Sequence, residues 1–359
     1  MTEILWKKRK EKYMDELVDI LLTTYNTKEK YLRKQLDTIL RQSHKKIKVY
    51  ISDDKSTDSR VAEILRQYEK QDKRIKLFIQ PNNLGYNKNF EFLLKQSTAN
   101  YIMFADHDDI WHLDKVEKSL KKIKQDNVDM VYCNCRQVDE DGVVLEDNYF
   151  KYKNVPLVKK KNKLCVSRCV GIGCSQIITK TVKEKMLPFK DDVIAHDWLA
   201  AFIASEGKGI SYIEETLFDY RLHNANVFGG RSLNQNINRW KKINGKGYKS
   251  FANYRKDVIK RAYADGIKMC KTYATDKQNK MFIENAQKYY EKIWVDKKIY
   301  WNLADYFKIL AGKNQGKKQI REFVLFHFPI LAYIKFAMIK VPKEEILRLP
   351  QTTSEKKGN

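Results

Sequence analysis

The sequence predicts an α/β fold in which a mostly parallel, Rossmann-like sheet is flanked by helices and followed by a helical C-terminal extension. Three observations support this fold class. Short apolar or β-branched segments alternate with helical periodicity between residues 17 and 104. Carboxylate-rich segments directly follow two of these apolar segments, as expected at the carboxyl ends of parallel strands. After residue 231 the periodicity is helical and strand signals are few.

The first half of the predicted sheet consists of four apolar segments, Val18–Leu22, Lys46–Ser52, Arg74–Gln80 and Asn100–Phe104. One helix is predicted between the first and second segments and another between the second and third, because apolar residues recur there on one helical face. These faces comprise Leu32, Leu36, Ile39 and Leu40 in the first helix and Val61, Leu65 and Tyr68 in the second. Asp58 precedes the second helix, and we expect it to cap the N-terminus of that helix.

The second half begins with a helix from Leu113 to about Asp126 and a fifth strand, Met130–Cys135. Asp139–Gly142 has the composition of a hairpin turn. The signals then weaken into a loop with a basic stretch at Lys159–Lys163. The remaining predicted elements are a strand or loop at Gly171–Thr179, a helix at Ala195–Ala204 and a strand at Gly209–Ile213. We place the main boundary near residue 230, so that residues 1–230 form one domain and residues 231–359 a basic helical region.

The net charge of +25 favours an anionic partner, which includes nucleic acid, acidic lipid and phosphorylated substrates. Residues 231–359 contain 29 Lys and Arg against 11 Asp and Glu, so most of the excess is C-terminal. The six cysteines form no C-x-x-C pair, and no histidine stands at zinc-ligand spacing from them, so we expect reduced thiols. The N-terminus contains no apolar stretch long enough for a signal sequence, which predicts a cytoplasmic protein.

Three carboxylates, Asp106, Asp108 and Asp109, lie within four residues after the fourth predicted strand. Carboxylates this close repel one another unless a cation relieves the repulsion, and hard oxygen ligands suit Mg²⁺ or Mn²⁺. The alternative is a helix cap with solvated neighbours. Taken alone, this cluster leaves both interpretations open.

A second acidic pair, Asp53 and Asp54, follows the second strand at the same edge of the predicted sheet. Carboxylates at this position bind ribose or base groups in dinucleotide folds, although an Asx turn entering a helix explains the pair equally well. The first strand is followed by Thr23–Asn26, which contains no G-x-G-x-x-G. The fingerprint of a dehydrogenase is therefore absent.

Six segments in order resemble glycosyltransferase family 2, the inverting, nucleotide-sugar-dependent enzymes of the GT-A fold, and bacterial surface-glycan transferases such as rhamnosyltransferases in particular. The matching segments span about residues 17–229 and are Asp19–Asn26, Tyr50–Asp58, Asn82–Asn89, Asp106–Trp111, His196–Trp198 and Tyr220–Asn226. Two positions depart from the family pattern: Lys55 replaces the usual Gly, and Lys88 the usual Arg. They put the contacts to the donor phosphates in doubt.

The resemblance implies a role for each matching residue. Donor-binding residues would be Thr24 and Tyr25 with Asp53 or Asp54 in the nucleotide pocket, and Asn83, Gly85 and Asn89 in a donor loop. The metal-binding D-x-D element would comprise Asp106, Asp108 and Asp109, with Asp106 also facing the donor. The donor would be a UDP-sugar or a dTDP-sugar, and the metal Mn²⁺ or Mg²⁺.

Asp197 resembles the family's general base, which removes the proton from the acceptor hydroxyl. Arg221 and His223 resemble a late motif that reaches the diphosphate, where a cation would stabilise the leaving group. Each has a structural alternative. These are a helix cap for Asp197, a surface ion pair for Arg221 and a satisfied loop histidine for His223.

The predicted acceptor is a hydroxyl of a glycan or lipid-linked glycan, which belongs to a surface polysaccharide, wall polymer or glycoprotein. The apolar stretch Phe323–Ile339 is flanked by lysines and interrupted by His327, Pro329 and Lys335, so it is a poor membrane span. An interfacial helix on the inner leaflet, a helical core and a homo-oligomer contact all remain open for it. We expect no nucleic-acid partner, but a basic nucleic-acid-binding protein and a non-catalytic protein of transferase-like fold remain alternatives.

Overall fold

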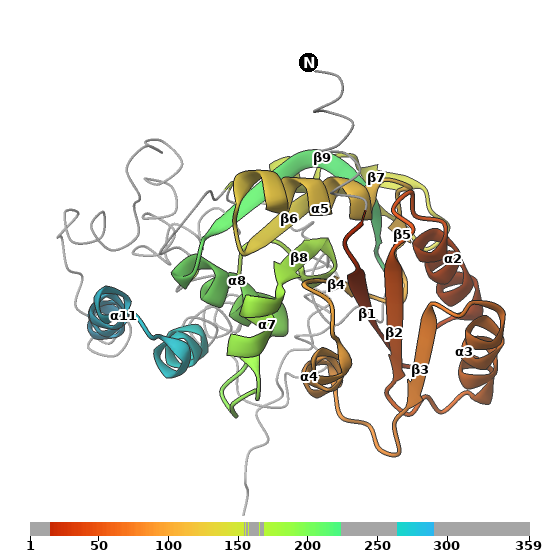
Figure 1. The fold of residues 1–359 in the computed structure, drawn as a ribbon, viewed down its shortest axis with the longest axis horizontal. Helices are drawn as coiled ribbons and strands as arrows, with labels where there is room; N and C mark the ends of the chain where they lie inside the picture. Colours follow the sequence, from red (N-terminus) through yellow and green to blue (C-terminus); the bar gives the residue numbers. More distant parts are fainter. Residues whose placement is uncertain are drawn as a thin grey trace, which may run out of the picture.

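The computed structural model describes residues 15–153, 155, 157, 165, 169–223 and 264–290. One mixed sheet runs through the described part in the order β3-β2-β1-β4-β8-β6-β9-β5, and β7 pairs with β6 (Figure 1). The strands are β1 (Val18–Thr24), β2 (Ile47–Asp53), β3 (Ile75–Ile79), β4 (Tyr101–Ala105), β5 (Ile110–Trp111), β6 (Met130–Val138), β7 (Val144–Glu146), β8 (Gln176–Thr179) and β9 (Ile210–Arg221).

The helices lie around this sheet, with α2 and α3 packed side by side beyond β2 and β3 in Figure 1. Helix α4 contacts β1, β2 and α8, while α5 contacts β6, β8 and β9. The helices are α2 (Glu29–Leu40), α3 (Ser59–Gln71), α4 (Tyr86–Gln96), α5 (Lys115–Asp126), α6 (Tyr149–Tyr152), α7 (Lys180–Met186), α8 (His196–Glu206) and α11 (Lys277–Tyr290). Residues 264–273 form a further helix before α11.

The sheet has two parts that differ in strand direction. Strands β3, β2, β1 and β4 are parallel, as the alternating pattern predicts. Strand β8 then runs antiparallel to both β4 and β6, while β6 and β9 are parallel to each other. The parallel part places the carboxyl ends of β1, β2 and β4 at one edge, where ligands bind in open α/β sheets.

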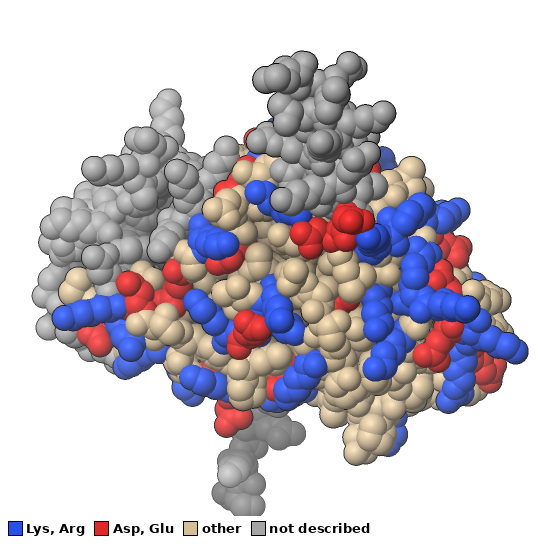
Figure 2. Space-filling model, in the orientation of Figure 1, with Lys and Arg blue, Asp and Glu red and all other residues tan. Residues whose placement is uncertain are grey.

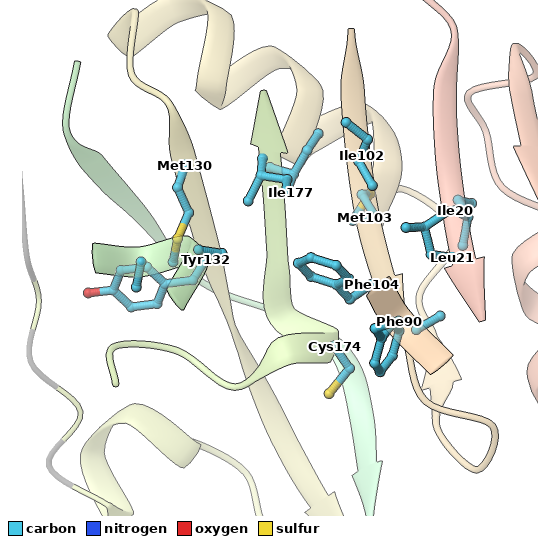
Figure 3. Close-up of a cluster of buried hydrophobic side chains, with 14 of the residues drawn as sticks. Ile20, Leu21, Phe90, Ile102, Met103, Phe104, Met130, Tyr132, Cys174 and Ile177 are labelled. Atoms are coloured by element: carbon cyan, nitrogen blue, oxygen red, sulfur yellow. The ribbon is translucent and has the colours of Figure 1, made fainter. Parts of the chain in front are cut away.

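The core is continuous across the sheet. Figure 3 shows Leu21 of β1, Phe104 of β4, Ile177 of β8 and Tyr132 of β6, which come from neighbouring strands. All four side chains are at most 1% exposed. Phe90 of α4 packs edge to face against Phe104, with ring centroids 5.4 Å apart. Burial of this apolar surface therefore joins both parts of the sheet in one hydrophobic core.

The predicted elements agree closely with the structure up to the hairpin. Asp58 caps α3, and its side chain accepts a hydrogen bond from the backbone N–H of Arg60 at 3.1 Å. Asp139 and Gly142 close the turn between β6 and β7. Some features differ from expectation: α4 begins inside the predicted donor loop, α6 and α7 are helices that were not predicted, β5 is an additional strand, and β9 continues to Arg221.

Most of the predicted C-terminal region lies outside the described residues, as do Lys159–Lys163 and Phe323–Ile339. The part that is described, 264–290, is largely helical as predicted. Within the described ranges, every helix is too short or too polar to cross a bilayer. All six cysteines are free thiols, which agrees with the expectation from their spacing. In Figure 2, blue basic and red acidic side chains are interspersed over the visible face.

Candidate active site

A cavity of about 1410 Å³ opens at the carboxyl ends of β1, β2 and β4 and continues toward α6 and α8. Most of the predicted site residues line it. They are Thr24, Tyr25, Asp54, Asn83, Gly85, Asn89, Asp106, Asp108, Asp197 and His223. Three predicted residues, Asp53, Asp109 and Arg221, lie behind the wall and not on it. The cavity therefore gathers motifs that are far apart in the sequence.

Asp54 joins the loop after β2 to the start of α4. Its Oδ1 accepts a hydrogen bond from the backbone N–H of Leu84 at 2.6 Å, and its Oδ2 accepts one from Gly85 at 2.9 Å. Gly85 has φ of 77°, a left-handed conformation that favours glycine. The Asn83 side-chain amide returns a hydrogen bond to the Asp54 carbonyl at 3.0 Å. Asp54 thus shapes the cavity wall through the backbone of the neighbouring loop.

Asp53 makes its hydrogen bonds within the turn after β2 and to β1, and it does not line the cavity. Its carboxylate accepts hydrogen bonds from the Thr24 hydroxyl at 2.7 Å and from the Ser56 hydroxyl at 2.6 Å. Asn89, on α4, donates to the Ser52 carbonyl at 3.2 Å, while its buried Oδ1 has no hydrogen-bond partner among the described residues. Of the two adjacent carboxylates, Asp54 is the one that reaches the cavity.

The carboxylates after β4 form a buried cluster in which neighbouring negative charges repel one another. Ligand atoms of Asp106, Asp109 and Cys174 lie within 4.8 Å of one another. Burial and the neighbouring Asp108 raise the pKa of Asp106 to about 7, and the same two causes raise the pKa of Asp109 well above its usual value. The buried Oδ2 of Asp109 has no hydrogen-bond partner among the described residues. This repulsion and unused oxygen are what a divalent cation would relieve, so the residues fit one.

Asp108 faces a different partner from its two neighbours. The His223 ring nitrogen Nε2 lies 2.6 Å from its Oδ2. Burial raises the pKa of Asp108, but the nearby His107 and His223 rings outweigh it and hold that pKa below the usual value. Asp108 is therefore ionised over the whole neutral range, whereas Asp106 and Asp109 gain their charge at higher pH.

Arg221 lies behind the cavity wall at the end of β9. Its guanidinium donates hydrogen bonds to the backbone carbonyls of Asp108 at 3.0 Å, Asp139 at 3.1 Å and Glu140 at 2.9 Å. The same group lies over the Tyr31 ring, 4.6 Å from its centroid. These contacts join the β6–β7 hairpin to the loop after β4. His223, by contrast, lines the cavity.

Asp197 lies in the first turn of α8 and lines the same cavity as the loops after β1 and β2. Its Oδ1 accepts a hydrogen bond from the backbone N–H of Trp198 at 2.8 Å. Burial raises its pKa to about 6, and hydrogen bonds from the Trp198 and Gly173 backbone and from the Cys169 thiol limit that rise. A carboxyl group with this pKa is ionised at neutral pH and still basic enough to accept a proton.

His196 comes directly before Asp197 in the sequence, and its ring packs in a hydrophobic site. Its ring centroid lies 4.1 Å from that of Phe90 and 4.8 Å from that of Phe104. Neither ring nitrogen has a hydrogen-bond partner among the described residues, and burial lowers the pKa of the ring to about 3. The neutral imidazole therefore acts as a core side chain that fixes the start of α8.

Several cavity residues carry no recognisable sequence signal. They include Lys28, Tyr31, Tyr149, Lys153, Cys169 and Asp265. Tyr31 stacks on His223 with ring centroids 5.6 Å apart, although it belongs to the helix between the first two strands. No motif surrounds these residues in the sequence, because each comes to the cavity only through the packing of its element.

Comparison with known proteins identifies related sequences. Residues 19–186 match the family model described as glycosyl transferase family 2. The chain is 26% identical over 227 residues to the putative teichuronic acid biosynthesis glycosyltransferase TuaG of Bacillus subtilis, covering 63% of this chain and 83% of that protein. It is 28% identical over 263 residues to the dTDP-rhamnosyl transferase RfbG of Shigella flexneri, covering 68% and 84%.

A solved structure supports the fold. The crystal structure of S. aureus TarS residues 1–349 in complex with UDP-GlcNAc superposes with a TM-score of 0.51 at 17% identity, covering 82% of this chain and 78% of that one. At this level of identity the likeness concerns the fold, which is the GT-A fold predicted from the six motifs.

Proposed function

We propose a reaction for this chain on the premise that it is a glycosyltransferase of family 2, with the family domain at residues 19–186. The reaction is an inverting transfer of a sugar from a nucleotide-diphosphate donor to a hydroxyl group of a glycan. The observation that carries this proposal is that Asp197 lines the same cavity as the nucleotide-side loops and the acidic cluster after β4. Its pKa is raised to about 6.

The donor would lie along the loops after β1 and β2. Thr24, Tyr25 and Asp54 line that end of the cavity, and Asn83 and Gly85 continue the wall. Tyr25 is 45% exposed, so its ring is accessible for stacking on a nucleobase. Asp53 would act by holding Thr24 and the turn in place. These residues suit a UDP-sugar and a dTDP-sugar equally well as the donor.

The donor diphosphate would lie beside the carboxylates after β4. Asp106, Asp108 and Asp109 would hold Mn²⁺ or Mg²⁺, with Asp106 and Asp108 on the cavity wall and the unused Oδ2 of Asp109 behind it. When bound, the cation would neutralise the charge that develops on the leaving diphosphate. His223 would orient Asp108 through their hydrogen bond, and Arg221 would hold the Asp108 backbone.

Asp197 would act as the general base. An inverting transfer is a single displacement, so the acceptor hydroxyl attacks the anomeric carbon on the face opposite the leaving diphosphate. One carboxylate on that face suffices to accept the hydroxyl proton as the new glycosidic bond forms. Asp197 would be this carboxylate, because it lines the cavity and its pKa is raised to about 6.

The acceptor would be a hydroxyl of a surface polysaccharide, wall polymer or glycoprotein glycan, free or linked to lipid. The names of the two bacterial relatives, one for teichuronic acid synthesis and one for rhamnosyl transfer, support a surface glycan. A cytoplasmic chain whose basic residues 231–359 contact the inner leaflet would suit a lipid-linked acceptor, because these residues carry most of the net charge.

A panel of nucleotide sugars tests this proposal. UDP-, dTDP- and GDP-sugars would each be added to the full chain with Mn²⁺, Mg²⁺ or EDTA, and the melting temperature measured. We expect one nucleotide class to raise it in a metal-dependent way, and the stabilising donor to be hydrolysed or transferred slowly. Absence of stabilisation by all donors, with or without metal, would contradict the proposed function.

A further inference from the structure

The cavity extends beyond what the donor needs. Its volume of about 1410 Å³ exceeds the roughly 300–1,000 Å³ typical of a small-molecule site. In the sheet order β2-β1-β4-β8-β6, nucleotide-side residues follow β1 and β2, and the acidic cluster follows β4. The far wall comes from the other part of the sheet, with Gly171–Gly173 before β8 and α6 after β6 and β7. This second half is where an acceptor would lie.

We propose that this half of the cavity binds an anionic acceptor, a saccharide that bears a carboxylate or phosphate group, through the ammonium of Lys153. The inference rests on the proposed function, because it assigns the substrate class of the same site. It concerns a residue that matches none of the six family motifs.

Lys153 is held in place by rigid neighbours. It is the C-terminal cap of α6 and donates its backbone N–H to the Tyr149 carbonyl at 2.9 Å. Asn134 of β6 anchors the same helix, since its Oδ1 accepts from the Phe150 N–H at 3.0 Å and its Nδ2 donates to Asn148 at 2.9 Å. Tyr149 and Phe150 are buried. The position of Lys153 therefore follows from the sheet.

Lys153 lacks a close ion pair in the described part of the chain, and Glu146 acts on its charge only from a longer distance. Lys28, the other lysine of the cavity wall, makes an ion pair with Glu140 at 2.6 Å. Lys153 makes no ion pair with any described residue, and its ammonium lies over the Tyr152 ring, 4.6 Å from the centroid. The side chain is half-buried, and a cation in such a place gains most from an anion that displaces water.

Two carboxylates limit where an anion can bind. Asp197 and Asp265 line the same cavity, and the helix at 264–273 approaches Trp198 so closely that a Cβ added to Gly266 would lie 2.3 Å from the indole ring. An acceptor anion would be repelled from this side and attracted to Lys153. Tyr149, beside Lys153, offers an aromatic ring for the sugar. The arrangement selects an acceptor with its charge on the α6 side.

The experiment compares a neutral saccharide with two anionic ones, a glucuronide of charge −1 and a 6-phosphate of charge about −2. Binding of methyl β-glucoside, methyl β-glucuronide and methyl β-glucoside 6-phosphate to the full chain would be measured calorimetrically, with UDP and Mn²⁺ present. The charged saccharides should bind about 10-fold more tightly than the neutral one, as one charge-assisted hydrogen bond implies. Lys153→Gln should abolish this preference, and Lys151→Gln, at an exposed position of the same helix, should keep it. Asp265→Asn should strengthen binding of the charged saccharides.

Two results would overturn the proposal: equal or undetectable binding of charged and neutral saccharides by the unaltered chain, or an equal loss of both in Lys153→Gln. A preference for glucuronide over phosphate, or the reverse, would identify which anion is recognised and support the proposal. Failure of UDP and the other nucleotides to bind would contradict the proposed function instead. The charge preference is measured separately, so the two failures are distinguishable.

Discussion

The Nε2 atom of His223 lies 2.6 Å from Oδ2 of Asp108, and each side chain is 8% exposed. The two residues are 115 positions apart in the sequence. Their contact joins the segment after β9 to the loop after β4, and both residues line the cavity. A change at either residue therefore affects the acidic cluster directly.

Asp108→Asn should abolish metal-dependent binding of the nucleotide and lower transfer by at least about 100-fold, because the neutral amide cannot hold a divalent cation. The readouts are the melting temperature with UDP and Mn²⁺ and the transfer rate. Asp191→Asn, at an exposed position, is the matched control and should behave as the unaltered chain. Retention of Mn²⁺-dependent stabilisation in Asp108→Asn would remove Asp108 from the metal site.

Asp54→Asn should weaken nucleotide binding by about 10-fold, because the amide cannot accept hydrogen bonds from both Leu84 and Gly85 with charge assistance. The free energy of unfolding should fall by about 2 kcal/mol for the same reason. Asp58→Ala is the control in the same loop. It removes the cap of α3 at a cost of about 1 kcal/mol and should leave nucleotide affinity unchanged. Equal affinities in all three proteins would show that the loop does not position the donor.

Asp197→Asn should lower transfer by about 1,000-fold while nucleotide binding persists, because the amide cannot accept the proton. It should also stabilise the fold above pH 7. Burial raises the pKa of Asp197 from 3.8 to about 6, so the ionised group lowers stability as pH rises through 6, and the neutral amide removes that loss. The gain should be about 1–3 kcal/mol in urea unfolding at pH 8. Full activity in this variant would refute the base assignment.

For the unaltered chain, kcat/KM should fall as the pH is lowered, with a midpoint near the Asp197 pKa of about 6. Below that pH the base is protonated, and the rate should fall about tenfold for each pH unit. The measurement covers pH 4.5–8.5 at saturating metal. Nucleotide affinity over the same range is the control. If affinity falls with the same midpoint, the fall in kcat/KM reports donor binding and not proton transfer.

Lys115→Met should lower the free energy of unfolding by about 1–3 kcal/mol, because it leaves a buried carbonyl without a donor. Lys115 is fully buried, and its ammonium donates to the Cys174 carbonyl at 2.7 Å. The same ammonium lies 3.6 Å from the Trp111 ring centroid and 4.0 Å from that of Phe218. Methionine keeps the length of the side chain but leaves that carbonyl unpaired. Urea unfolding measures the loss, and Lys121→Met, on the exposed side of α5, should change stability by less than about 0.5 kcal/mol.

The edge of the sheet that carries the site could be predicted, because parallel strands bring their carboxyl ends together whatever the loops contain. Asp54, Asp106 and Asp108 reach the cavity for this reason. The orientation of individual side chains could not be predicted. Asp53 accepts a hydrogen bond from the backbone N–H of Ser56, the local turn that its sequence left open, and its contact with Thr24 of the neighbouring strand depends on the fold.

Later parts of the chain were harder to predict. Strand β9 was expected to end at Ile213 but continues to Arg221, because pairing with β6 extends it beyond its own apolar pattern. Lys153 and Asp265 enter the cavity through the packing of α6 and of the helix at 264–273. Tertiary contacts determine such placements, and the hydrophobic periodicity of a single sequence does not reveal them.

The close approach of Gly266 to Trp198 limits where the chain can be shortened. A protein cut at the composition change near residue 230 would lose the backbone that shields this indole, together with Asp265 of the cavity wall. Residues 1–230 alone would keep all six family motifs, but the Trp198 indole would be exposed to solvent. Exposed aromatic surface promotes self-association. The family signature alone is thus a poor guide to where this enzyme can be divided.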